Sequence, residues 1–419
     1  MKHARKEAPV KRTIMLLALL FALGCVATAA AAEEKTPGYT FTFSGYFKAD
    51  LAYDQTRVNS GNYALYVTAP DILDAEDNNV LNITARESRF GLDFLWNEND
   101  IRTDARFEFD FYGLGVSSAG LTSQENKATS MLRHAYAQIT KGHWSFLAGQ
   151  TSDIISPLVP KTANYTVCWD QGNIGYRRPQ FRISTYTEAG DHGKVSAAIG
   201  IFRTLGGNLD GDGVDDGADA AVPTLQGRVA VSSKVREKGT MELGVSAHYG
   251  REEYGEPPDN DAEVTSWSGN VDLRYTPCPR WELLGELFMG RNLGSYFGGV
   301  GQTVNLLGDE IAANGGWAEL SFKATDRLWL NAGYGFDDPD DNDFVITPSI
   351  TSVRSFIAKN SVVFGSAMYS ITSTVTAMVE LSRLATTYQY KAYIADELVS
   401  DEADYDDMRL QLSLKAAIK

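Results

Sequence analysis

The chain has 419 residues, a formal net charge of −16 and a hydrophobic fraction of 43%. The acidic balance argues against a nucleic-acid partner. A negative mean hydropathy excludes a bundle of membrane-spanning helices, and the three cysteines are too few for a disulfide framework.

The first predicted element is a cleaved secretory signal over residues 1–32. Basic residues between Lys2 and Arg12 precede an apolar stretch, Ile14–Leu23, and Ala30–Ala32 provides a small-residue cleavage site. An alternative is a lipoprotein signal with Cys25 as the lipidated residue, although Ala22 stands where leucine is usual. Because residues 1–32 carry five basic residues and one acidic residue, their removal leaves a net charge of −20.

Residues 33–419 show an alternation of apolar and polar side chains that indicates β-strands. At the C-terminal end, Leu410 and Leu412 alternate with Arg409 and Gln411. Long and short connections also alternate, which is typical of outer-membrane barrels. The predicted fold is therefore all-β, a transmembrane antiparallel β-barrel of 16 strands with long extracellular loops and short periplasmic turns. The expected strands are 39–53, 80–96, 101–113, 130–140, 143–151, 179–189, 193–205, 223–234, 239–251, 264–276, 280–291, 315–324, 327–337, 353–369, 374–388 and 405–418.

The strand 101–113 shows why the polar face must line a lumen. Phe107 and Phe109 share one face, and Arg106 and Glu108 share the other. Turning an arginine or lysine toward the middle of the bilayer costs ~2–4 kcal/mol, so we expect the phenylalanines to face lipid. Amphipathic rings collect at the lipid–water boundary, and four tryptophans adjoin short turns: Trp96, Trp144, Trp281 and Trp329.

Five segments resemble DcaP-like porins of Gram-negative outer membranes. They are Phe43–Asp50, Glu87–Phe94, Leu132–Tyr136, Leu147–Asp153 and Gly175–Arg182, within about residues 39–190. The resemblance implies a trimeric, sixteen-stranded porin that passes small anionic solutes through a positively charged constriction, in contact with outer-membrane lipid and lipopolysaccharide. The chain departs from the family pattern because no coiled-coil segment precedes the barrel and because it ends on Ile418 and Lys419 rather than on an aromatic residue.

The loop 152–178 is expected to fold into the barrel, where Lys161, Arg177 and Arg178 would border the constriction. Strand phase adds six lumen-facing basic residues, and Arg133 has an ambiguous phase. The alternatives are a solvated external loop and basic residues that each pair with a wall carboxylate. The six residues are Lys48, Arg89, Arg106, Arg182, Arg228 and Arg274.

The predicted function is passive diffusion of small hydrophilic anions, dicarboxylates among them, through a water-filled barrel. A non-conducting barrel that acts as an adhesin or structural anchor is the first alternative, and an outer-membrane hydrolase is the second. We expect no enzyme activity because the histidines lack metal-ligand spacing and no G-x-S-x-G motif occurs.

The sharpest local motif is an acidic segment between residues 208 and 219. Its oxygen donors have the spacing of a calcium-binding loop, with Gly213 at the turn position. The alternative is a solvated acidic loop tip, and no other cofactor is expected. The predicted ligands are the side chains of Asn208, Asp210, Asp212, Asp216 and Asp219 and the carbonyl of Val214.

Overall fold

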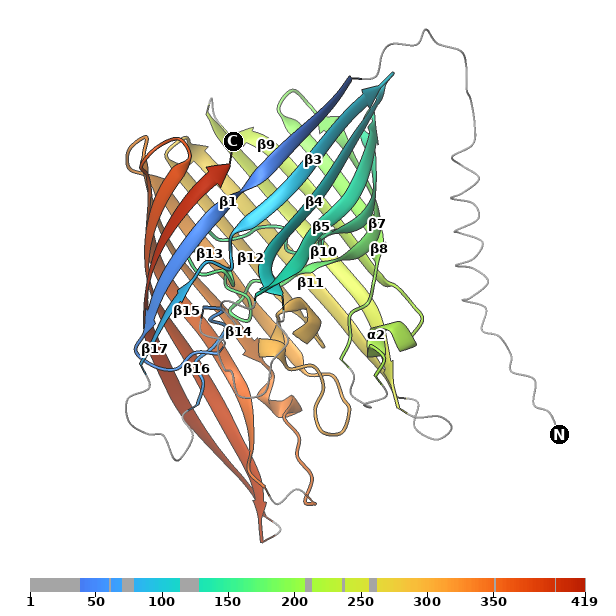
Figure 1. Cartoon of the computed structure of the whole chain (residues 1–419). Helices are drawn as coiled ribbons and strands as arrows, with labels where there is room; N and C mark the ends of the chain where they lie inside the picture. Colours follow the sequence, from blue (N-terminus) through green and yellow to red (C-terminus); the bar gives the residue numbers. More distant parts are fainter. Residues whose placement is uncertain are drawn as a thin grey trace, which may run out of the picture. The chain divides into compact units, whose positions relative to one another are not determined.

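The structure is a computed structural model (Figure 1) that describes residues 38–59, 62–69, 79–113, 128–207, 213–235, 238–255, 262–349, 352–395 and 397–418. The predicted signal segment therefore lies outside the described residues. The chain divides into two units, Met1–Gly38 and Tyr39–Lys419, and the second of these is the barrel.

The barrel wall is one antiparallel sheet. Its strands β2 and β3 are successive pieces that both pair with β1, so seventeen strands occupy the sixteen predicted positions. The strands are β1 (Gly38–Asp54), β2 (Val80–Thr84), β3 (Arg89–Glu98), β4 (Ile101–Gly113), β5 (Thr129–Lys141), β6 (Trp144–Ser152), β7 (Arg177–Ala189), β8 (Gly193–Phe202), β9 (Thr224–Val235), β10 (Gly239–Tyr254), β11 (Ala262–Cys278), β12 (Trp281–Arg291), β13 (Ala312–Lys323), β14 (Leu328–Pro339), β15 (Arg354–Ser370), β16 (Val375–Ile394) and β17 (Glu397–Ile418).

The sheet closes where the first strand meets the last. Strand β1 runs beside β17 in Figure 1, with Gly45 opposite Ile418 and Asp54 opposite Arg409. Apart from the pairing of β3 with β1, the other neighbouring pairs join strands that are consecutive in the chain. This closure leaves no exposed sheet edge, which a barrel in lipid requires, and it confirms the predicted fold class.

The two faces of the wall differ in polarity as the alternation predicts. On β4, Phe107 is 43% exposed on the outer face, whereas the neighbouring Glu108 is 4% exposed. On β17, Leu412 is exposed, while Arg409 and Gln411 are buried inside. The exterior is thus apolar and the interior polar, the inverse of a soluble sandwich.

Two departures from the predicted strands concern continuity. The predicted strand 80–96 is interrupted at residues 85–88, where Ser88 N–H bonds the Ala85 carbonyl in a turn. The predicted loop 389–404 is instead a paired hairpin, because β16 extends to Ile394 and β17 begins at Glu397.

Short helical pieces lie in the connections. They are α2 (Asp216–Asp219), η2 (Gly294–Tyr296), η3 (Gly299–Gly301) and η4 (Asp341–Asp343). Within the described ranges, no helix is long and apolar enough to cross a membrane. Cys168 and Cys278 are free thiols.

Candidate functional site: a lumen passage beside an inserted loop

Loop 3, residues 153–176, contacts the far wall of the barrel. Three carboxylates on that wall accept hydrogen bonds from its backbone. Leu158 N donates to Glu286 Oε1 of β12 at 2.7 Å and Ala163 N donates to Glu380 Oε2 of β16 at 2.6 Å. Lys161 N donates to Glu319 of β13. These wall acids therefore hold the middle of the loop across the lumen.

The two ends of loop 3 meet at Asp153. Its carboxylate accepts from Tyr176 N at 2.9 Å and from Gln226 Nε2 at 2.8 Å, and it lies 3.0 Å from Arg178 Nε. The loop is closed further by Asp153 N, which donates to the Tyr176 carbonyl at 2.9 Å. A buried carboxylate with these partners fixes the base of the loop.

Loop 1, the described part of residues 55–69, packs between loop 3 and the wall. Asn360 Nδ2 of β15 donates both to the Leu65 carbonyl of loop 1 at 2.8 Å and to the Asp170 carbonyl of loop 3 at 2.7 Å. Val58 and Val67 join Cys168 in a buried apolar cluster that also contains Phe364 and Leu384. Both loops therefore fill the side of the lumen next to β15 and β16.

Loop 6, residues 292–311, covers part of the same side. The Tyr296 carbonyl accepts a hydrogen bond from Gly175 N at 2.8 Å, and the Phe297 carbonyl accepts one from Asp170 N at 3.0 Å. On β14, Asp337 accepts from Gly299 N at 3.1 Å. Loops 1, 3 and 6 thus form one packed insert against β12–β17.

Where loop 3 crosses β13 and β14, backbones approach closely. A Cβ on Gly172, which has a φ of +110°, would lie 2.1 Å from the Gly316 carbonyl oxygen. A Cβ on Gly335 would lie 2.2 Å from the Gln171 carbonyl oxygen. Only glycine permits this approach.

Between loop 3 and the opposite wall there remains a cavity of about 470 Å³, called here the arginine-lined cavity. Four arginines and one histidine line it, facing aromatic side chains of the loop. Its charged and aromatic lining residues are Tyr46, Glu87, Arg89, Arg133, His134, Asp153, Tyr165, Trp169, Tyr176, Arg177 and Arg182.

The four arginines differ in their partners. Arg133 binds Asp110 at 2.6 Å and Glu108 at 3.1 Å, and Arg89 lies 3.6 Å from Glu108. Arg177 and Arg182 have no carboxylate within 4.0 Å among the described residues. The latter two guanidinium groups therefore give the cavity uncompensated positive charge.

Arg177 is the more enclosed of these two. Its side chain is 7% exposed, and its Nε and Nη2 atoms are buried without a hydrogen-bond partner within the described structure. The guanidinium carbon lies 4.5 Å from the Tyr176 ring centroid and 5.8 Å from that of Trp169. Two rings thus hold a buried cation at the cavity, and its free N–H groups can donate to an anion.

Arg133 faces the lumen although its phase matches Ala135 and Ala137. The register of β4 with β5 shifts between Glu108 and Phe109, which are opposite His134 and Leu132. A β-bulge places an extra residue in the strand and redirects its side chain. This bulge resolves the ambiguity that the sequence left at Arg133.

Two predicted pore residues on the wall are paired. Lys48 is 4% exposed, bonds Glu87 and lies 3.3 Å from Asp50. Arg106 bonds Glu108 and lies 3.2 Å from Asp93. Both therefore take part in ion pairs along the wall and do not line the arginine-lined cavity.

The predicted loop residues Lys161 and Arg178 are also engaged. Lys161 Nζ bonds Glu282 and donates to Ser321 Oγ at 3.1 Å. Arg178 is fully buried under loop 6, where its guanidinium carbon lies 3.9 Å from the Tyr296 ring centroid. Neither residue lines the arginine-lined cavity.

The remaining two predicted residues lie on β9 and β11. Arg228 makes a bidentate contact with Asp272, at 2.6 and 3.0 Å, and reaches Glu242 at 2.8 Å. Arg274 lies 3.7 Å from Glu282. These contacts match the alternative that wall arginines pair with wall carboxylates.

Sequence reasoning did not single out Lys415 or the wall acids that hold loop 3. Lys415 Nζ of β17 lies 3.9 Å from the Tyr46 ring centroid. The guanidinium carbon of Arg89, on β3, lies 5.4 Å from the same centroid. The alternation of β17 does indicate that Lys415 faces inward. Nothing in the sequence distinguishes Glu286, Glu319 and Glu380 from other lumen acids, because their partners are backbone amides of a distant loop.

Burial also changes the acidity of groups in loop 3. Burial raises the pKa of the Asp170 carboxyl to about 7. A hydrogen bond from Gly301 N–H acts in the opposite direction but is the smaller effect. Burial likewise raises the pKa of the Cys168 thiol. The neutral thiol is a poor nucleophile, so Cys168 acts here as a packing residue.

The calcium prediction falls largely outside the described residues, which omit 208–212 and hence Asn208, Asp210 and Asp212. Of the described part, Asp215 caps α2 by accepting from Gly217 N, and Asp216 is buried. Among the described residues no group of three or more His, Cys, Asp or Glu side chains is placed to hold a metal ion. The calcium site therefore stays a prediction.

Comparison with known proteins gives a fold but no close relative. The chain matches no protein-family model and no curated protein. Among solved structures, it is similar to the outer membrane channel DcaP of Acinetobacter baumannii, with a TM-score of 0.65 at 17% identity over 91% of this chain and 98% of that one. It is also similar to an anion-selective porin from Comamonas acidovorans, with a TM-score of 0.54 at 12% identity over 91% and 100% of the chains.

A third similar structure is the trimer form of OmpT from Vibrio cholerae, with a TM-score of 0.53 at 11% identity over 91% of this chain and 99% of that one. The chain thus has the fold of outer-membrane porins of Gram-negative bacteria, with long loops folded against the inside of the wall. The resemblance to DcaP-like porins seen in the sequence is confirmed at the level of the fold.

Proposed function

We propose that the protein is a diffusion porin that prefers small anions, with the arginine-lined cavity as its narrow passage. The single observation that supports this proposal is that acidic side chains of the lumen bind the backbone of loop 3, whereas two arginines of the lumen have no carboxylate partner among the described residues. Acids on β12, β13 and β16 accept hydrogen bonds from the backbone of loop 3. Arg177 and Arg182, on the open side, keep their charge free of carboxylates among the described residues. A net acidic chain can therefore present a positive passage.

A passage with uncompensated guanidinium groups raises the local concentration of anions, and low-dielectric walls strengthen the effect. Arginine forks match carboxylate groups bidentately. Small carboxylates, dicarboxylates among them, are the proposed solutes. The proposed assembly is a homotrimer, in line with the trimer form of a protein with the same fold.

The test is the reversal potential across a potassium chloride gradient for protein in planar bilayers. We expect chloride preference in the parent and a fall of about fivefold or more in the anion-to-cation permeability ratio when Arg177→Gln and Arg182→Gln are combined. Arg383→Gln is the matched control, because it removes the same charge from an exposed residue paired with Asp406. A double variant as anion-selective as the parent would refute the assignment of these arginines.

A further inference from the structure

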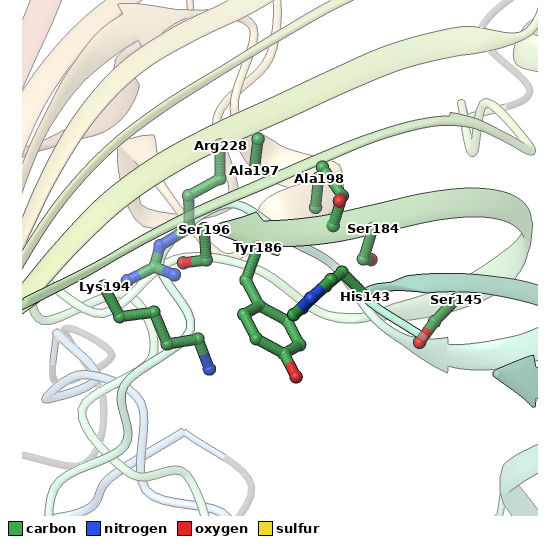
Figure 2. Close-up of a pocket in the computed structure, with 10 residues that line it drawn as sticks. His143, Ser145, Ser184, Tyr186, Lys194, Ser196, Ala197, Ala198 and Arg228 are labelled. Carbon is green, nitrogen blue, oxygen red and sulfur yellow. The ribbon is translucent and has the colours of Figure 1, made fainter. Parts of the chain in front are cut away.

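A second cavity lies on the lumen side of β6–β9, toward the short turns, and it has a volume of about 280 Å³. Figure 2 shows its side chains. They come from β6, β7, β8 and β9 and from the turn before β6. The register places Ser145 opposite Ser184, and Tyr186 opposite Ser196. Short turns are periplasmic in barrels of this kind. We name this cavity the exit pocket, lined by His143, Ser145, Ser184, Tyr186, Lys194 and Ser196.

The Tyr186 ring organises the exit pocket. Lys194 Nζ lies 4.3 Å from the ring centroid, and the His143 ring meets Tyr186 edge-on with centroids 4.5 Å apart. A cation over an aromatic face is attracted by the ring quadrupole. The ring therefore holds the ammonium group of Lys194 beside the cavity.

The charge of Lys194 is not compensated by a close carboxylate. Glu188 is the cross-strand neighbour of Lys194, yet no carboxylate lies within 4.0 Å of Lys194 Nζ among the described residues. Arg228, which also lines the pocket, binds both Asp272 and Glu242. Lys194 is thus the cation available to a ligand, and Ser196 and Ser184 lie two and four register positions from it toward the arginine-lined cavity.

The exit pocket lies on the same wall as the arginine-lined cavity. Arg182 and Tyr186 belong to the same face of β7, four residues apart, or about 13 Å at the rise of a β-strand. Ser184 lies between them and lines the pocket. An anion that leaves Arg182 therefore meets hydroxyl groups and then an ammonium group before it reaches the periplasm.

From this arrangement we infer that the exit pocket is a second binding site for small carboxylates, in which Lys194 binds the anion and the serine hydroxyls of Ser184 and Ser196 donate to it. The inference rests on the proposed porin function and deepens it. Conduction through a selective pore benefits from several weak sites rather than one strong site, and the exit pocket supplies the second.

The first test measures the acetate-to-potassium permeability ratio from reversal potentials, with potassium acetate as the salt. We expect Lys194→Gln to lower the ratio about threefold and Lys194→Arg to retain it. Lys141→Gln is the matched control, because Lys141 is a lysine near the same short turns that already pairs with Asp100 at 3.3 Å. If Lys194→Gln behaves as Lys141→Gln does while the Arg177→Gln and Arg182→Gln variant loses selectivity, the exit pocket is refuted and the proposed function stands.

A second readout does not depend on conduction. Saturation transfer to the acetate methyl group is measured on detergent-solubilised protein that carries Arg177→Gln and Arg182→Gln. These substitutions weaken anion binding in the arginine-lined cavity. We expect transfer to persist there and to fall at least about threefold when Lys194→Gln is added. Equal transfer with and without Lys194→Gln would overturn the inference, even if the channel itself proved not to prefer anions.

Discussion

At the scale of single residues, the path of loop 3 depends on Gly335. This glycine faces the loop on β14, and a Cβ there would lie 2.2 Å from the Gln171 carbonyl oxygen. Overpacking of a filled site costs ~1–3 kcal/mol. Gly335→Ala should therefore displace loop 3 and accelerate tryptic cleavage after Lys161 by about tenfold.

The matched control for Gly335→Ala is Gly365→Ala on the neighbouring β15. A Cβ on Gly365 would come no closer than 4.0 Å, to the Asn331 carbonyl oxygen. Cleavage after Lys161 should stay at the parent rate in this variant. Equal cleavage of the two variants would show that the contact between Gly335 and the loop has no role.

A second residue-scale prediction concerns Glu87, which lines the arginine-lined cavity and bonds Lys48. Glu87→Gln removes a negative charge from the passage, so the anion-to-cation permeability ratio should rise about twofold. Glu402→Gln removes the same charge from an exposed position of the β16–β17 hairpin and should leave the ratio unchanged. A ratio that falls in Glu87→Gln would contradict the assigned position of the passage.

At the scale of elements, loop 3 is held by wall acids. Hydrogen bonds to a charged acceptor contribute about 1.5–3 kcal/mol each. The double variant Glu319→Ala with Glu380→Ala lacks the acceptors for Lys161 N and Ala163 N. Hydrogen exchange at those two amides should therefore be faster by more than about tenfold. The open-channel current should become noisier as the loop moves.

The control for the wall acids is Glu242→Ala, which removes a carboxylate paired with Arg228 and remote from loop 3. Protection of the Lys161 and Ala163 amides should survive this change. If the double variant keeps its amide protection as well, the acids do not fasten the loop.

The packing of loop 3 should also depend on pH through Asp170. Burial raises the pKa of this carboxyl from 3.8 to about 7, so the packed loop binds the proton more tightly than the free loop does. The stabilisation is complete below about pH 4 and is lost as the pH rises to about 7. Asp337 on β14 lies close enough to raise the cost of a second charge, and Tyr63 and Tyr66 of loop 1 face the same carboxyl.

Open-channel noise is the measurement for Asp170. It should grow between pH 4 and pH 7 in the parent and change less in Asp170→Asn, which keeps a neutral side chain at every pH. Noise that falls as the pH rises, or that rises equally in the variant, would contradict this assignment.

The sequence predicted the wall well because the membrane imposes a strict rule on it. Alternation at Leu410, Leu412 and their polar neighbours reports lipid on one side and water on the other. The rule ends where the wall leaves the membrane. In the hairpin beyond Tyr388, the first six residues of β17, from Glu397, are all exposed, so the alternation fades and the paired strands resemble a polar loop.

The lumen was harder to predict because its contacts join distant parts of the chain. Phase shows that Arg182 and Arg228 both point inward. It cannot show that Arg228 meets Asp272, whereas Arg182 meets no carboxylate in the described part of the chain. The bulge beside Glu108, which turns Arg133 inward, has no signal in a single sequence. The insertion of loops 1 and 6 depends on packing by Val58, Val67 and Tyr296 that no local pattern reports.

At the scale of the whole molecule, the closed wall and the packed insert lead to one functional statement. Sixteen strand positions enclose a lumen, the insert fills the side next to β12–β17, and the arginine-lined cavity, where Arg177 and Arg182 have no carboxylate within 4.0 Å among the described residues, remains beside β3–β7. The proposed porin needs this cavity to be an open, charged passage, whereas an adhesin or structural anchor does not. Conduction therefore separates the proposed porin from that alternative.

The most direct measurement is single-channel recording of the purified, folded protein in a planar bilayer under a potassium chloride gradient. The proposed function predicts discrete current steps and a reversal potential displaced toward that of chloride. Folded protein that gives no current steps, or steps with a reversal potential displaced toward that of potassium, would contradict it.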